Sequence, residues 1–231
     1  IKVGDHLLLA YKSKVYGEML VEEIFNYNLN EYSKQLFGTA DLKHPGVRRL
    51  MDGGDTFIAG EIIKYYNYSP LAEKLKHYLY SPKQMRKIFD MKGWSRVVAF
   101  HTRNVPHRAH ELLQKLALND NYCDGILIQP VVGYGNPGDI KNELIIESYE
   151  LLLEKILKDN RYLLGALGYY PRFAGPKEAL LNAIIRKNYG CTHFIVGRNH
   201  AGVGNYYPET SYHLMFEKYK EALGIEILRF G

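Results

Sequence analysis

Short apolar runs alternate with longer amphipathic stretches from Trp94 to the end of the chain. Each short run predicts a buried β-strand: RVVAF (96–100), GILIQPVV (125–132), YLLGALGY (162–169), THFIVG (192–197) and IEILRF (225–230). The longer stretches, in which apolar residues recur with the helical period, predict helices over 107–118, 141–158, 175–190 and 209–223. Strands that alternate with helices are joined by crossovers and run parallel. The pattern therefore predicts an α/β fold with a doubly wound parallel sheet.

The first 66 residues have a different pattern. Strand-like segments are separated by KSKVY and MDGGD, and they are HLLLAY (6–11), GEMLVEEIF (17–25) and TFIAGEIIKYY (56–66). Residues 30–51 predict a short helix and a Pro-Gly turn. Residues 67–95 are polar and contain one capped helix that ends at Gly93, and we interpret them as a linker. Two domains are expected, 1–66 and 67–231.

Composition narrows the class of protein only slightly. The chain has 231 residues, of which 46% are hydrophobic and 24% charged, as in ordinary globular proteins. A net charge of +5 suits an anionic substrate or simply a solvated basic surface, and no Lys/Arg run indicates nucleic acid. Two cysteines without a CxxC pair argue against a disulfide scaffold and fit a reducing cytoplasm. No apolar stretch has membrane-spanning length, so we expect no membrane partner.

The segment HTRNVPHRAH (101–110) carries the strongest candidate chemistry. His101, Arg103 and Asn104 are expected just past the carboxyl end of a strand, and His107 and His110 share one face of the next helix's first turn. Helix N-termini favour anions, so this group predicts a polyphosphate site that stabilises charge on a leaving pyrophosphate.

Two other interpretations of this segment exist. One histidine could merely cap the helix. A zinc site is disfavoured because the histidines are three rather than four residues apart, Arg108 lies between them, and Glu111 points away from His110. We therefore expect no protein-bound metal.

A second polar segment, VGRNHAGVG (196–204), also follows a strand. Its small residues allow close approach of the backbone to a ligand, while Arg198 and His200 supply charge or hydrogen-bond donors. The segments QPVVGYGNPGDI (129–140) and YYPRFAGPKEAL (169–180) follow strands too, and for both a ligand contact and a purely structural turn are equally compatible with the sequence.

Together these segments resemble a known family. HTRNVPHRAHE is similar to the Gln-x-Arg-Asn-Pro-x-His-x-x-His motif of ATP sulfurylase (sulfate adenylyltransferase), a member of the HxxH nucleotidyltransferase superfamily. GPKEALLNAIIRKNYGCTHFIVGRNHAGVG resembles the family segment that ends in Gly-Arg-Asp-His-Ala-Gly. The resemblance implies a Rossmann-like parallel-sheet nucleotidyltransferase domain preceded by a small PUA-like β domain.

The resemblance also implies a reaction and its residues. MgATP and sulfate would give adenosine 5′-phosphosulfate and pyrophosphate, reversibly, in a cytoplasmic homo-oligomer of sulfur metabolism such as sulfate assimilation. Thr102, Arg103 and Asn104 match the catalytic residues. ATP binding is implied for His101, Thr102, Arg103, Asn104, His107, His110, Gly197, Arg198, Asn199 and His200. Sulfate binding is implied for His101, Arg103 and the backbone N–H of Ala201.

Three residues depart from the family pattern. His101 replaces a glutamine, Val105 a proline and Asn199 an aspartate. Because His101 would touch the acceptor, an adenylyltransferase for another oxyanion or a phosphorylated acceptor is an alternative. A nucleotide-binding relative without activity is a further alternative.

Overall fold

The protein is described here by a computed structural model of residues 1–11, 13–66, 73–120, 122–133, 140–197 and 200–230. The chain divides into two compact units, Ile1–Pro70 and Leu71–Gly231. The first unit contains β1 (His6–Tyr11), β2 (Lys14–Asn26), α1 (Leu29–Phe37), α2 (Pro45–Asp52) and β3 (Thr56–Tyr65). The second begins with α3 (Glu73–Lys76), α4 (Pro82–Lys92), β4 (Val97–Thr102), α5 (Arg108–Asp120), β5 (Gly125–Val132) and α6 (Asn142–Lys155). It continues with β6 (Tyr162–Leu164), β7 (Leu167–Gly168), α7 (Pro176–Asn188), β8 (His193–Ile195), α8 (Glu209–Leu223) and β9 (Glu226–Leu228).

The first unit is a three-stranded antiparallel sheet in the order β1-β2-β3, which confirms the predicted strands. Strand β2 begins at Lys14, inside the segment predicted to separate two strands. The predicted Pro-Gly turn is wrong, because Pro45 and Gly46 open a second helix, α2. His44 caps this helix: its Nδ1 atom accepts hydrogen bonds from the backbone N–H groups of Gly46 (3.1 Å) and Val47 (3.3 Å).

The segment interpreted as a linker is partly folded into the second unit. Helix α4 confirms the predicted capped helix, with a capping box between Ser81 and Gln84 and a left-handed Gly93 at its end. Leu75 of α3 and Met85 and Phe89 of α4 are buried in the hydrophobic cores of the second unit. The linker interpretation is therefore wrong for α3 and α4, because the apolar side chains of these helices pack in the hydrophobic cores of the second unit.

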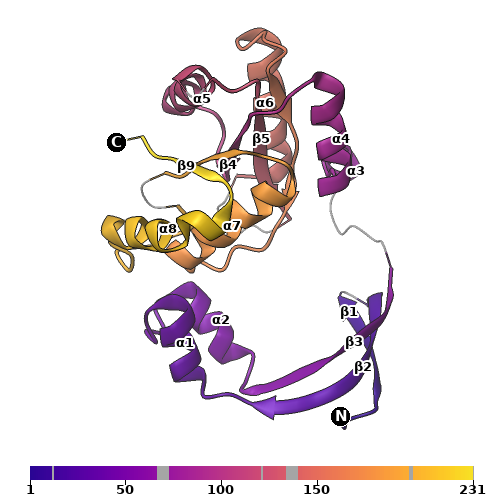
Figure 1. Cartoon of the computed structure of the whole chain (residues 1–231). Helices are drawn as coiled ribbons and strands as arrows, with labels where there is room; N and C mark the ends of the chain where they lie inside the picture. The colour runs from indigo at the N-terminus through magenta and orange to yellow at the C-terminus, as the bar shows by residue number, and fades with distance from the viewer. Residues whose placement is uncertain (12, 67–72, 121, 134–139, 198–199, 231) are drawn as a thin grey trace. The chain divides into compact units, whose positions relative to one another are not determined.

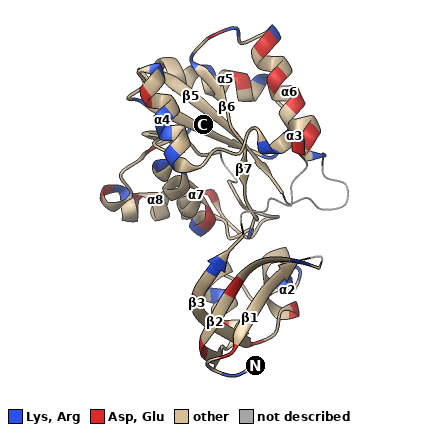
Figure 2. Ribbon diagram, turned by 90° about the vertical axis from the view of Figure 1, so that its right-hand side faces the viewer, with Lys and Arg blue, Asp and Glu red and all other residues tan. Residues whose placement is uncertain are grey.

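The second unit is a parallel sheet between two layers of helices, which confirms the predicted α/β class (Figure 1). Its strand order is β6-β5-β4-β8-β9, with β7 also pairing with β5. Side chains of α5 and α6 pack on one face of the sheet, and side chains of α4, α7 and α8 pack on the other. Lys, Arg, Asp and Glu residues are spread along α4 and α6 (Figure 2).

The predicted strands and helices of this unit are confirmed, with differences in their bounds. Strand β4 continues to Thr102, so His101 lies within the strand and not past its end. The third predicted strand is split into β6 and β7 at Gly165 and Ala166. Ile156, which continues the apolar period of α6, is 61% exposed because the helix ends before it.

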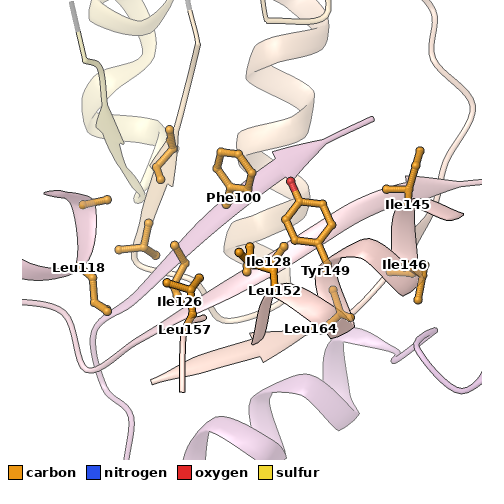
Figure 3. Packing of buried hydrophobic residues seen from close by; sticks show 14 of the residues in the cluster. Phe100, Leu118, Ile126, Ile128, Ile145, Ile146, Tyr149, Leu152, Leu157 and Leu164 are labelled. Carbon is orange, nitrogen blue, oxygen red and sulfur yellow. The ribbon is translucent and has the colours of Figure 1, made fainter. Parts of the chain in front are cut away.

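Tyr149 of α6 connects the core to the candidate site. Its side chain is fully buried in a cluster that includes Phe100, Ile128 and Leu152 (Figure 3). Its hydroxyl lies at the end of the ring that points away from Leu152 in this view. Apolar packing around the ring therefore holds the hydroxyl oxygen of Tyr149 close to the carboxyl end of β4.

Candidate functional site

The candidate site lies at the carboxyl edge of the parallel sheet, where β4 and β8 are neighbours. Their parallel pairing runs from Val98↔His193 to Phe100↔Ile195. In sequence order, β5 and β6 follow β4 on one side of it in the sheet, and β8 and β9 lie on its other side. Ligands of open α/β sheets bind beyond the carboxyl ends of the strands where the strand order reverses in this way. Both polar segments, 101–110 and 196–204, leave the sheet at this point.

Strand β4 sends consecutive side chains to opposite faces of the sheet. Ala99 packs in the core on the α7 face, and His101, two residues later, lies on the same face. Phe100 packs in the core on the α5 face, which Thr102 shares. At its carboxyl end, β4 therefore places one polar side chain on each face of the sheet, His101 on the α7 face and Thr102 on the α5 face.

Thr102 shapes the turn after the strand. Its side chain is buried, and its hydroxyl oxygen accepts a hydrogen bond from the backbone N–H of Asn104 (3.1 Å) and lies 3.2 Å from the carbonyl oxygen of Asn104. This local turn leaves the side chains of Arg103 and Asn104 exposed. The guanidinium of Arg103 lies over the ring of Phe173, 5.6 Å from its centre.

His107 and His110 lie against each other at the start of α5. The carbonyl of His107 accepts the helical hydrogen bond of Glu111 (3.2 Å), so His107 occupies the N-cap position, one residue before the helix predicted to contain it. The two imidazole rings are 3.7 Å apart, and His110 Nδ1 lies 3.3 Å from the hydroxyl of Tyr149. Burial, followed by the nearby His107, lowers the pKa of His110 to about 4, so the His110 ring is neutral at pH 7.

His101 and His200 meet on the other face of the sheet, with ring centres 4.7 Å apart. Behind them Arg186 of α7 lies 2.7 Å from His101 Nδ1, and Asn182 Nδ2 lies 3.2 Å from His200 Nε2. Burial, with the charges of Arg186 and Arg103, lowers the pKa of His200 to about 3. The same causes, together with His200, hold the pKa of His101 well below its usual range. Both rings are therefore neutral hydrogen-bonding groups at neutral pH.

The loop before α7 is fixed to the same site by Glu178. Its carboxylate accepts hydrogen bonds from the Tyr169 hydroxyl (2.8 Å) and from the backbone N–H groups of Arg172 (2.9 Å) and Ala174 (3.0 Å). Gly175 then donates its N–H to the carbonyl of Ala201 (3.1 Å), which joins this loop to the segment after β8.

Gly175 tolerates no side chain at this junction. Its φ is +53°, and a Cβ atom added there would lie 2.5 Å from the ring of Tyr207. Tyr207 in turn donates its hydroxyl hydrogen bond to the carbonyl of Phe173 (2.8 Å). Ala201 has a φ of +57°, which is unusual for a residue with a side chain and indicates a backbone shaped by these contacts.

The structure brings together most of the residues that the sequence singles out. Arg103 and Asn104 follow β4, His107 and His110 form one pair, and His101 and His200 form the other. Gly197 follows β8 with open space where a side chain would be. Arg198 and Asn199 lie outside the described residues.

Sequence reasoning missed Glu178, Asn182 and Arg186. All three side chains are buried, at 2%, 0% and 0% exposure. They are four residues apart along α7, on the helix face that also carries Ala179 and Ala183. Polar residues repeated at helical spacing on the buried face of a helix are the signal that could have identified them.

Within the described ranges, no group of at least three His, Cys, Asp or Glu side chains is arranged to hold a metal ion. Of the helices in the described part of the chain, none has both the length and the apolar character needed to cross a membrane.

Comparison with known proteins places both units in described families. Residues 76–231 match the model of the ATP-sulfurylase family, and residues 1–66 match that of a PUA-like domain. A sulfate adenylyltransferase of Ignicoccus hospitalis is 44% identical over 207 residues, which cover 90% of this chain and 53% of that protein. A sulfate adenylyltransferase of Pyrococcus abyssi is 43% identical over 222 residues, covering 96% and 57% respectively.

A solved structure shares the fold. The hexameric APS kinase from Thiobacillus denitrificans superposes with a TM-score of 0.69 and 18% identity, over 100% of this chain and 38% of that chain. The chain spans about half the length of the curated relatives it matches, with 53% and 57% of the two relatives covered. Because the family model matches most of the chain, from residue 76 to residue 231, this protein belongs to the ATP-sulfurylase family.

Proposed function

We propose that this chain forms the catalytic site of a sulfate adenylyltransferase, which converts MgATP and sulfate into adenosine 5′-phosphosulfate and pyrophosphate. The observation that carries the proposal is the convergence of hydrogen-bond donors at the carboxyl edge of β4 and β8. Arg103 and the neutral His101 and His200 come from one side, and His107 and His110 from the other. Family membership and the sulfate adenylyltransferase relatives support it.

The chemistry needs such donors more than it needs a general base. Sulfate is already ionised, and one of its oxygens forms a bond to the α-phosphorus of ATP while the bond from that phosphorus to the bridging oxygen of pyrophosphate breaks. The electron pair of the broken bond leaves with pyrophosphate, and no proton has to be removed. Catalysis then consists of placing two anions in line and stabilising the charge that moves between them.

The proposal gives each predicted residue a role. Arg103 holds sulfate and Asn104 contacts the phosphates that react, with Thr102 keeping the turn between them in place. His107 and His110 hold the departing phosphates, and the neutral His110 ring donates from Nε2 when the Tyr149 hydroxyl donates to Nδ1. Gly197, Arg198, Asn199 and His200 bind the nucleotide, and His101 and the backbone N–H of Ala201 bind sulfate.

Magnesium enters this proposal with ATP, as part of the substrate. Mg²⁺ prefers oxygen ligands, and the described side chains of the site are mainly nitrogen donors that do not fit it as ligands. We assign the ion to the phosphate oxygens of ATP and to water, and no step is assigned to a protein-bound metal.

We take residues 1–66 as the PUA-like domain and 67–231 as the adenylyltransferase domain, in a homo-oligomer. The cytoplasm is the proposed compartment, since both cysteines, Cys123 and Cys191, are buried and free.

Pyrophosphate release tests the proposed function. The full chain is incubated with MgATP, with and without sulfate, and pyrophosphate is measured. We expect release that depends on sulfate, and we expect Arg103→Gln to lower the rate by about 100-fold, as for loss of one charge-stabilising donor. Arg161→Gln is the matched control, because Arg161 pairs with Asp159 before β6, at the amino edge of the sheet. Nucleotide binding without any turnover would contradict the proposal.

His101 favours one alternative, an adenylyltransferase for another oxyanion or a phosphorylated acceptor. An imidazole is shorter than the glutamine of the family motif, so it would suit an acceptor that reaches deeper into the site. Pyrophosphate release that is unaffected by sulfate but rises with another oxyanion would support this alternative.

A further inference from the structure

Arg186 is a buried cation whose charge is not used by any ion pair in the described structure. Its side chain is fully buried, and among the described residues no carboxylate lies within salt-bridge distance of its guanidinium. Its Nε atom has no hydrogen-bond partner among the residues that the structure describes. Burying an unpaired charge is costly, so a purely structural role would be served better by an apolar side chain.

The contacts of Arg186 lead to the two histidines of the site. Its Nη2 atom lies 2.7 Å from His101 Nδ1, and its Nη1 atom lies 3.1 Å from the side-chain oxygen of Asn182. A guanidinium can only donate hydrogen bonds. His101 Nδ1 must therefore be an acceptor, and the single proton of this neutral ring is on Nε2.

Asn182 fixes the position of the proton on the His200 ring in the same way. Its side-chain oxygen accepts from Arg186, so its Nδ2 amide group is the donor toward His200 Nε2, 3.2 Å away. His200 Nε2 is then an acceptor, and the proton of its ring is on Nδ1. One guanidinium thus determines the position of the proton on two rings whose centres are 4.7 Å apart.

We propose that Arg186 is the positioning residue of the anion site, which holds His101 as the Nε2–H tautomer and, through Asn182, His200 as the Nδ1–H tautomer. Each ring then has an N–H donor on the side opposite its anchored nitrogen, as an oxyanion such as sulfate requires. The buried charge adds a favourable potential for a dianion without touching it. The substrate part of this inference rests on the proposed function.

The tautomers can be measured without any turnover. Long-range ¹H–¹⁵N correlation spectra of the full chain distinguish Nε2–H from Nδ1–H rings, and His101→Gln and His200→Gln assign the signals. We expect His101 as Nε2–H and His200 as Nδ1–H at pH 7. A proton on His101 Nδ1, or a charged His101 ring, would overturn the proposal.

Two variants separate the positioning role from a structural one. Asn182→Asp keeps the shape and can still accept from Arg186, but it can no longer donate to His200. We expect the proton of the His200 ring to move to Nε2, while the tautomer of His101 is unchanged. Arg186→Met removes the charge at similar volume, and in folded protein we expect the KM for sulfate to rise about tenfold or more, with a smaller change in kcat, as for loss of a charge-assisted hydrogen bond. An unchanged His200 tautomer, or an unchanged KM in folded protein, would contradict the proposal.

Arg96→Gln is the matched control. Arg96 also contacts a histidine, with 3.3 Å between its Nη2 atom and His193 Nε2, but this pair lies at the opposite, amino edge of β4 and β8. We expect its loss to leave the KM for sulfate and the tautomers of His101 and His200 unchanged. A rise in KM equal to that of Arg186→Met would overturn the proposal. Wild-type protein without sulfate turnover would contradict the proposed function alone, since the tautomers are measured independently.

Discussion

At position 101 a histidine offers the hydrogen bonds that a glutamine would offer. His101 Nδ1 accepts from Arg186, which leaves Nε2–H as the donor. A glutamine side chain can likewise accept through Oε1 and donate through Nε2. The departure from the family motif at this position therefore keeps the pattern of acceptor and donor and changes mainly the reach of the side chain.

Substitution of His101 tests this equivalence. We expect His101→Gln to keep the KM for sulfate within about threefold, a difference of less than 1 kcal/mol. His101→Leu should raise it about tenfold or more, because it removes the donor and leaves Arg186 without its acceptor. Steady-state kinetics with sulfate varied measure both effects, and an equal loss in the two variants would show that an imidazole is specifically required.

The low pKa of His110 makes stability depend on pH in a defined range. The ordinary pKa of histidine is 6.5, and in the folded protein that of His110 is about 4. The unfolded chain therefore binds a proton first, so the free energy of unfolding falls as the pH drops from about 6.5 to about 4. His101 and His200, whose pKa values are also lowered, act in the same direction.

Urea unfolding between pH 7 and pH 4 measures this dependence. We expect His110→Gln to make the decline shallower, because a glutamine does not titrate and can still accept the hydrogen bond of Tyr149. His6→Gln, at an exposed site in the first unit, should leave the decline unchanged. A wild-type free energy of unfolding that is constant over this range would contradict the expected neutral histidines.

Helix α7 connects several parts of the candidate site. Its buried face carries Glu178, Asn182 and Arg186 in place of apolar residues, and each contacts a different part of the site. Glu178 holds the loop that precedes the helix, Asn182 holds His200, and Arg186 holds His101. The helix thus connects the loop before it, β4 and the segment after β8.

Glu178→Gln tests the contribution of this helix to stability. The carboxylate accepts three hydrogen bonds through two oxygens, whereas a glutamine has one acceptor oxygen and would direct an amide group at backbone N–H donors. We expect a loss of about 2 kcal/mol in the free energy of unfolding. Chemical denaturation measures it, with Glu217→Gln on the exposed face of α8 as a control that should change stability by less than about 0.5 kcal/mol.

The same helix shows what the sequence could and could not predict. Periodicity was sufficient for α7 and for the strands around it, because apolar residues at fixed spacing must face a core. The location of the polar segments at the carboxyl ends of β4 and β8 followed from the alternation of strands and helices. Arg186 and Asn182 were not predicted, since periodicity identifies a buried face but not the polar partner that a buried side chain finds on another element. The turn at Pro45 was mistaken because proline followed by glycine is compatible with both a turn and a helix start.

At the scale of the whole molecule, the chain has two units with very different cores. Among the described residues of the first unit, the buried hydrophobic side chains are Val21, Phe37 and Val47, whereas the second unit has two extended clusters, one on each face of its sheet. Stability follows the apolar area that is buried, so the first unit should be the less stable of the two. The protein contains one tryptophan, Trp94, which packs on Phe89 in the second unit (5.9 Å between ring centres).

Thermal unfolding should therefore occur in two steps that different probes separate. Trp94 fluorescence follows only the second unit, while far-UV circular dichroism follows both, so we expect a first transition that is visible in circular dichroism and absent from fluorescence. All residues proposed to bind MgATP lie in the second unit. MgATP at 100 times its Kd should raise the fluorescence Tm by about 5 °C and leave the first transition in place. Trp94→Phe, which should abolish the fluorescence change but keep both transitions in circular dichroism, controls for the probe. A single transition that coincides in both probes and moves as a whole with MgATP would show instead that the two units unfold as one.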